Sequence, residues 1–79
     1  MTEQQIQKKR IDQLEAEGYF VIKLTVTNKN GIPDILAIAP GADVLFCEVK
    51  TPKGVLSKIQ EYRIKELERH GIRTEIYRG

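Results

Sequence analysis

Two stretches of the chain repeat apolar residues at helical spacing, and each begins with a capping signal. In both, a Thr or Ser is followed three residues later by a Gln, the pattern of a capping box. The first helix is predicted over residues 2–17 and the second over residues 57–70. Gly18 and Gly71 come directly after these stretches, at the position where glycine commonly ends a helix.

Four segments rich in β-branched and aromatic residues predict strands, at residues 19–26, 34–39, 44–50 and 72–78. The tight turn Pro40–Asp43 predicts that the second and third strands form a hairpin. The order is therefore α-β-β-β-α-β. This order indicates an α+β fold in which two helices pack against a mixed sheet, and the 79 residues form a single domain, 1–79.

Composition adds few constraints. The formal charge is only +2, which is weak evidence for a nucleic-acid partner, and a chain this short buries a modest core. The polar N-terminus lacks the apolar stretch of a signal peptide, and no apolar run is long enough to span a membrane. We therefore expect a soluble, cytoplasmic protein, in which the single Cys47 is a small buried hydrophobe.

Charged residues interrupt the two strands of the predicted hairpin. Side chains alternate along a strand, so Glu48 and Lys50 point to the same side of the third strand. Asp34 shares its face of the second strand with Leu36 and Ile38. Antiparallel pairing would bring the start of one strand beside the end of the other. The pattern thus predicts two carboxylates and a lysine at one end of the sheet.

The two helices carry similar interruptions, because Glu3 and Gln60 both fall within the apolar stripes of their helices, as does Arg63. Simpler explanations exist: Glu48 and Lys50 on a solvated strand face, Gln60 as a capping residue only, and Glu3 as an acid favoured by the helix dipole. However, unpaired buried charges cost several kcal/mol each. We therefore expect these residues to share one site, where a divalent cation would neutralise the carboxylates.

These residues resemble the motifs of the PD-(D/E)xK nuclease superfamily, and more narrowly those of the virus-type replication-repair nuclease (VRR-NUC) domain. The matching segments are Gly31–Asp34, then Glu48–Lys50, then Leu56–Ser57 leading to Gln60. The similarity covers nearly the whole chain and implies a core like that of restriction endonucleases. Stand-alone members of this family are small, often phage-encoded and related to Holliday-junction resolvases that work as two-fold dimers.

The resemblance implies a metal-dependent DNA endonuclease that acts on branched DNA, plausibly four-way junctions, as a homodimer. Mg²⁺ or Mn²⁺ would be bound by Asp34, Glu48 and the main-chain carbonyl of Val49, with Glu3 as a further candidate ligand. Lys50 would orient the attacking water or stabilise charge on the phosphate, and Gln60 would position Lys50 or that water. The remaining candidates are DNA contacts at the phosphates: Lys29, Lys53 and Lys58.

Two other classes compete with this interpretation. A double-stranded-RNA-binding domain has the order α-β-β-β-α and clusters basic residues at the start of its last helix. Here that helix begins with one lysine near an acid, and Asp34 and Glu48 would stay unexplained. The other alternative is a catalytically inactive nuclease fold that serves as a scaffold, against which the presence of Asp34, Glu48 and Lys50 argues.

Overall fold

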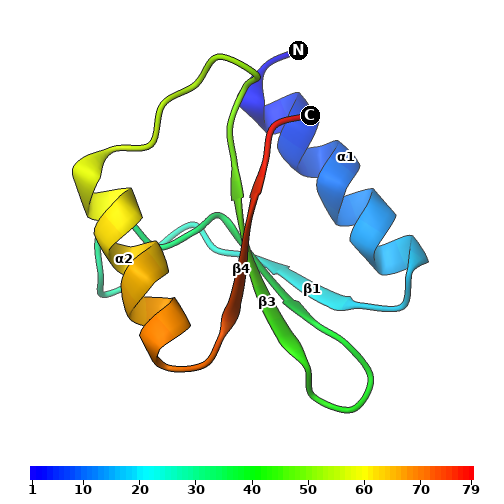
Figure 1. Cartoon of the computed structure of the whole chain (residues 1–79). Coiled ribbons are helices and arrows are strands. Elements are labelled where there is room, and N and C mark those ends of the chain that lie inside the picture. The colour runs from blue at the N-terminus through cyan, green and yellow to red at the C-terminus, as the bar shows by residue number, and fades with distance from the viewer.

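The elements follow the predicted order. The computed structural model describes all residues, 1–79, and contains two helices and four strands. Figure 1 shows how they are arranged. Their bounds are α1 (Glu3–Ala16), β1 (Phe20–Lys23), β2 (Ile35–Ile38), β3 (Val44–Val49), α2 (Lys58–Arg69) and β4 (Arg73–Tyr77). Both capping boxes form as predicted, at Thr2 and at Ser57. The α+β prediction is therefore confirmed.

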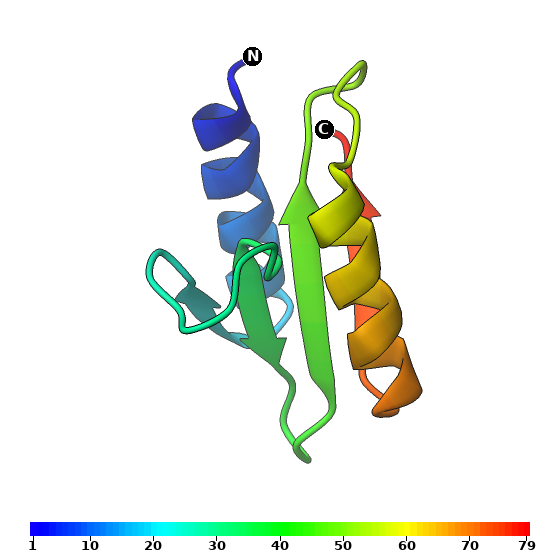
Figure 2. The same cartoon turned by 90° about the vertical axis from the view of Figure 1, so that its left-hand side faces the viewer.

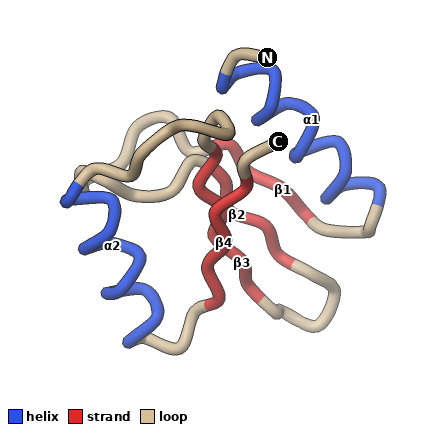
Figure 3. The backbone as a smooth tube through the Cα atoms, turned by 45° about the horizontal axis from the view of Figure 1, so that its top comes forward, coloured by secondary structure: helices blue, strands red, loops and turns tan.

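The strands form one mixed sheet in the order β1-β2-β3-β4. The pairs β1–β2 and β2–β3 are antiparallel, whereas β4 lies parallel to β3. A parallel neighbour requires a crossover connection, and α2 provides it. Figures 2 and 3 show the helices on opposite sides of the sheet, α1 on one and α2 on the other. Helix α1 packs against β1 and β3, while α2 lies along β4.

The hydrophobic core lies between α1 and the sheet. Every fully buried apolar side chain of the cluster belongs to α1, β2 or β3: Ile6, Leu14, Ile35, Ala37, Leu45, Cys47 and Val49. Burial raises the pKa of the Cys47 thiol, which agrees with its predicted role as a small hydrophobe. Helix α2, in contrast, contains no fully buried residue. The α1 side of the sheet therefore supplies most of the apolar burial that stabilises this fold.

Strand β1 is shorter than the sequence predicts. It ends at Lys23 and not at Val26, and the last backbone bond to its neighbour runs from the Leu24 amide to the Asp34 carbonyl (2.8 Å). Continuing the observed register places Thr25 opposite Pro33. Proline has no N–H group for a ladder bond, so the pairing stops there. The apolar residues beyond this point leave the sheet, and Val26 is 91% exposed.

One ion pair fastens α1 to the edge strand β4. The Arg10 guanidinium donates two hydrogen bonds to the Glu75 carboxylate, from Nε to Oε2 (2.9 Å) and from Nη2 to Oε1 (2.8 Å). The Arg10 side chain is only 15% exposed and lies over the ring of Tyr77, 4.8 Å from its centroid. A bidentate, partly desolvated pair of this kind is stronger than a solvated one. This ion pair adds to the stability that the small hydrophobic core provides.

We expect Arg10→Met to lower the free energy of unfolding by about 1–3 kcal/mol, because Glu75 would keep a partly buried charge without its partner. The matched control is Lys8→Met, which removes an ion pair of α1 whose two side chains are 78% and 60% exposed. That change should cost roughly 0.5 kcal/mol or less. Urea unfolding of both variants measures the difference. Equal losses would contradict the importance of the Arg10–Glu75 pair.

Candidate functional site

The hairpin register brings two carboxylates together. Strands β2 and β3 pair Ile35 with Cys47, so extending the register by one residue places Asp34 opposite Glu48. Both belong to the face of the sheet on which α2 lies, because the alternating residues Ile35 and Cys47 belong to the core on the α1 side. The juxtaposition predicted from strand alternation is therefore present at the end of the hairpin that is remote from its turn.

Glu48 is buried although its side chain is ionisable, and only 2% of its surface is exposed. Its Oε2 accepts a hydrogen bond from the Nε2 of Gln60 (3.3 Å), whereas its Oε1 is buried without any hydrogen-bond partner. A buried carboxylate oxygen without a partner is costly for a small domain. Such an exception to the usual pairing of buried polar atoms points to a functional role.

Burial and the neighbouring Asp34 raise the pKa of the Glu48 carboxyl to about 8. Desolvation is the largest cause, followed by the negative charge of Asp34. The positive charge of Lys50 acts in the opposite direction, and the charge of Glu3 adds a smaller effect that raises the pKa. Ionisation of Glu48 is therefore disfavoured in the folded chain.

Asp34 is held in place by the backbone of β3. Its Oδ2 accepts a hydrogen bond from the Val49 amide (2.9 Å), and its main-chain carbonyl accepts the last bond from β1. The preceding Pro33 is buried and has a restricted backbone. These contacts fix the carboxylate beside Glu48 and leave its other oxygen, Oδ1, without a hydrogen bond to the protein.

Gln60 completes the cap of its helix, as one interpretation of the sequence expected, and also contacts Glu48, whereas its predicted role toward Lys50 or a water stays a prediction. Its Oε1 accepts a hydrogen bond from the Ser57 amide (2.9 Å) and so completes the capping box of α2. Its Nε2 points toward the sheet and donates to Glu48. The start of α2 is therefore connected through one side chain to the buried carboxylate.

Lys50 lies half-buried directly after β3, and its amide donates to the Tyr77 carbonyl (3.0 Å). The loop that follows folds back against it, because a Cβ added at Gly54 would lie 3.3 Å from the Cβ of Lys50. Arg78 holds this loop by donating to the main-chain carbonyls of Thr51 and Gly54. No motif in the sequence indicated Arg78, because the contact joins residues far apart in the chain.

The remaining residues predicted for the site are exposed. Glu3 is exposed in the first turn of α1, and no three His, Cys, Asp or Glu side chains gather closely enough to hold a metal ion. Its role as a ligand stays a prediction. Lys29, Lys53 and Lys58 are exposed, in the β1–β2 loop, the β3–α2 loop and the first turn of α2. A hollow of about 380 Å³ inside the β1–β2 loop has Lys29 and Asp34 in its wall.

The donor atoms suit a hard divalent cation. Asp34 and Glu48 supply two adjacent carboxylates, and the buried Oε1 of Glu48 has no protein partner. Carboxylate and main-chain carbonyl oxygens are the ligands that Mg²⁺ prefers, and this ion keeps several waters when few protein ligands are present. Two carboxylates with the neighbouring Val49 carbonyl therefore fit such an ion.

Comparison with known proteins identifies related domains. The model of a family described as the VRR-NUC domain matches residues 23–79. A solved structure titled "VRR_NUC domain" superposes with a TM-score of 0.88 at 27% sequence identity, covering 98% of this chain and 84% of that one. No curated protein matches the chain. Neither helix is long and apolar enough to cross a lipid bilayer.

The raised pKa of Glu48 predicts how stability changes with pH in the absence of metal. The unfolded chain loses this proton near 4.5 and the folded chain near 8, so the folded state binds more protons in between and stability falls as pH rises. In Glu48→Gln this loss is absent. The variant should exceed wild type in unfolding free energy by roughly 2–4 kcal/mol at pH 9 and by little at pH 5.

Thermal melts from pH 5 to 9 with a chelator measure this difference. In the presence of Mg²⁺, wild type should regain stability most strongly at high pH, where the carboxylates are ionised, and Glu48→Gln should respond little. An exposed carboxylate of α1 provides the matched control, Glu15→Gln, for which we expect no such pH trend. Parallel pH profiles for wild type and Glu48→Gln would refute the raised pKa of Glu48.

Proposed function

Because this chain belongs to the VRR-NUC family of nuclease domains, we propose that it hydrolyses phosphodiester bonds of DNA as a Mg²⁺- or Mn²⁺-dependent endonuclease. The observation that carries this proposal is the buried Glu48, which has an unpartnered oxygen beside Asp34. A structural role would favour a neutral or paired side chain at that position. A cation-binding role explains why an ionisable carboxyl group occupies this buried position.

In this proposal Asp34, Glu48 and the Val49 carbonyl hold the ion, with Glu3 as a further candidate through the waters. When bound, the ion would neutralise charge on the scissile phosphate and favour ionisation of a nearby water. The residues of the chain provide the alignment. The backbone amide of Val49 orients Asp34, and the side-chain amide of Gln60 orients Glu48. The free carboxylate oxygens therefore need little rearrangement to bind the ion.

Lys50 supplies the positive charge of the site. Its charge lowers the pKa of Glu48, which supports a place for its ammonium near that carboxyl group. We assign it to the attacking water or to the non-bridging phosphate oxygens, where charge develops during hydrolysis. The packing of Gly54 against its aliphatic stem and the bonds from Arg78 limit the directions that the Lys50 side chain adopts.

Three exposed lysines are proposed to contact the DNA backbone: Lys29, Lys53 and Lys58. Lys53 and Lys58 belong to the loop and helix start that follow Lys50, so a strand whose phosphate reaches the site would pass close to them. Lys58 also lies at the positive end of the α2 dipole. Their contribution is to affinity and not to sequence preference.

We also propose that two copies associate through the part of the sheet that α2 leaves uncovered. On this face β1 exposes Phe20 (66%) and Ile22 (38%), and β2 places the half-buried Leu36 and Ile38 beside them. Association would bury these exposed apolar side chains and so add hydrophobic stabilisation to a domain whose own core is small. A two-fold dimer would present two sites at fixed separation, which suits the symmetry of a four-way junction.

We expect Lys50→Ala to reduce the cleavage rate by at least about 100-fold, because a preorganised charge at the reacting phosphate is lost. Mn²⁺ affinity should change little, since lysine is not a ligand. Glu48→Ala should lose both cleavage and Mn²⁺ binding. The measurements are single-turnover cleavage of labelled linear, flapped and four-way DNA, and titration calorimetry with Mn²⁺.

The control for Lys50→Ala is Lys65→Ala, which removes an exposed lysine of α2 that makes no hydrogen bond or ion pair. It should cleave like wild type. Cleavage by purified Glu48→Ala at the wild-type rate would show that the site has been assigned to the wrong residues.

We expect Phe20→Ser to be monomeric. The wild-type dimer should nick four-way junctions at symmetric positions. Light scattering at micromolar concentration gives the mass, and mapping of cleavage on a junction gives the positions of the nicks. Because Phe20 is exposed in the single chain, its replacement should leave the monomer folded. A monomeric wild type that cuts single strands and junctions equally would reject the resolvase-like activity, although a monomeric nuclease would be consistent with the same site.

A further inference from the structure

Helix α2 is less buried than α1, and polar contacts connect it to other parts of the molecule. It contributes no fully buried side chain, and its packing partner in the sheet is the edge strand β4. Toward its N-terminal half, two side chains one turn apart reach other parts of the molecule. Gln60 reaches Glu48 in β3, and Arg63 reaches the β1–β2 loop. Hydrophobic burial alone therefore does not set the position of Gln60.

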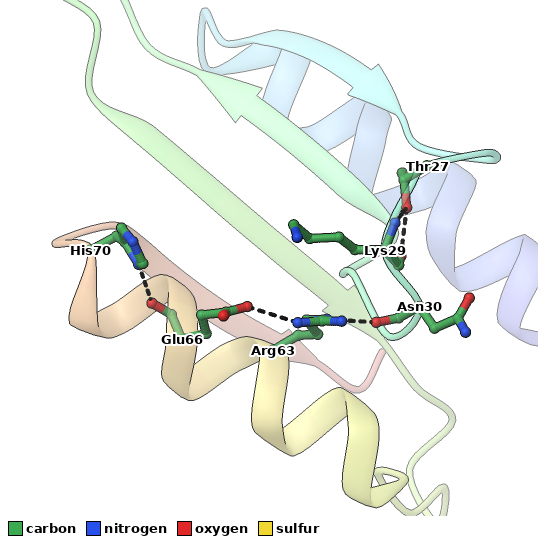
Figure 4. A network of polar contacts seen from close by, with 6 residues as sticks. All are labelled: Thr27, Lys29, Asn30, Arg63, Glu66 and His70. Atoms are coloured by element: carbon green, nitrogen blue, oxygen red, sulfur yellow. Dashed lines mark hydrogen bonds and ion pairs between the residues drawn. The ribbon is translucent and has the colours of Figure 1, made fainter.

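Arg63 ties this loop to the helix (Figure 4). Its Nε donates to the main-chain carbonyl of Asn30 (2.8 Å), and its Nη1 donates to Oε1 of Glu66 on the next turn of α2 (2.9 Å). The Arg63 side chain is only 18% exposed. The hydrogen bond from Arg63 lowers the pKa of Glu66, so the acceptor stays charged and holds the guanidinium in its orientation.

The loop also touches α2 directly at the next residue. Gly31 has φ of +80°, and a Cβ built on it would lie 2.8 Å from the main-chain oxygen of Ile59. Only a glycine allows the two main chains to approach this closely. The Asn30 carbonyl and the Cα of Gly31 thus form two adjacent contacts between the β1–β2 loop and the first turns of α2.

From this arrangement we infer that Arg63 is a positioning residue, which latches the loop carrying Asp34 to the helix carrying Gln60. Asn30 precedes Asp34 by four residues, and Gln60 precedes Arg63 by three. Asp34 and Gln60 approach Glu48 from these two separate segments. The latch, defined as Arg63 with Asn30 and Gly31, fixes one segment against the other. Its consequence for catalysis rests on the proposed function, whereas its structural consequence does not.

The fork geometry of arginine explains the residue type. One guanidinium bonds the Asn30 carbonyl and Glu66 from two different nitrogens. A lysine ammonium is a single point of charge on a flexible stem and cannot reproduce two fixed directions. Lys29 extends from the same loop toward the side of α2 where Glu66 lies (Figure 4), and its charge also lowers the pKa of Glu66. The charge of Lys29 thus favours the ionised form of Glu66 that Arg63 contacts.

The first test needs no enzymatic activity. Hydrogen exchange followed by mass spectrometry or NMR should show faster exchange of residues 27–32 and of the first turns of α2 in Arg63→Met. Exchange in the α1 core should stay unchanged. Gly31→Ala should reproduce this pattern from the loop side, because its Cβ would push Ile59 away. The matched control Lys65→Met, an exposed change on the same helix, should exchange like wild type.

The second test separates positioning from binding. In Arg63→Met the maximal single-turnover cleavage rate should fall by about 10–100-fold, the usual effect of removing a residue that orients metal ligands. The dissociation constant for junction DNA without metal should remain at the wild-type value. Arg63→Lys keeps the charge and should not restore the rate. It also serves as the folded variant if Arg63→Met proves too unstable to purify.

The outcomes of the two tests are distinguishable. Wild-type exchange in both Arg63→Met and Gly31→Ala would overturn the latch, as would full cleavage activity in Arg63→Lys. If wild type itself cleaves no DNA in Mg²⁺ or Mn²⁺, the proposed function fails. The exchange pattern then still decides whether Arg63 holds the loop and the helix together.

Discussion

The buried carboxyl group of Glu48, one oxygen of which has no hydrogen-bond partner, is the constraint around which the rest of this structure is arranged. It lies near the end of β3 beside a second carboxylate, where desolvation and like charge both oppose ionisation. A domain of this size has little stability to spare. The hydrogen bond from Gln60 and the nearby charge of Lys50 reduce the cost of an ionised Glu48, although its pKa stays raised.

The two faces of the sheet differ in role: one face carries the hydrophobic core, and the other carries the candidate site. On the α1 side, apolar side chains interdigitate and the Arg10–Glu75 pair fastens the helix to β4. On the α2 side, the sheet carries both carboxylates, and Gln60 and Arg63 of the helix make hydrogen bonds to β3 and to the β1–β2 loop.

Local signals in the sequence predicted much of this fold and the centre of the site. The two capping boxes begin the helices where they were expected, because the interacting residues lie within one turn. The Pro40–Asp43 turn and strand alternation together bring Asp34 beside Glu48. The prediction for β1 was wrong at its C-terminal end, because Thr25 lies opposite Pro33, which cannot continue the ladder.

The order of the elements and the pairing of the two acids follow from the sequence, since they depend on periodicity and on contacts across one hairpin. The partners of the long side chains depend instead on how distant segments pack together. Gln60 serves both the cap and Glu48, Arg63 holds the Asn30 carbonyl, and Arg78 holds the loop after Lys50. Their partners are set by the packing of α2 and β4 against the sheet. Sequence periodicity does not indicate which acceptor a long arginine side chain will reach. That acceptor is known only when the positions of the segments in space are known.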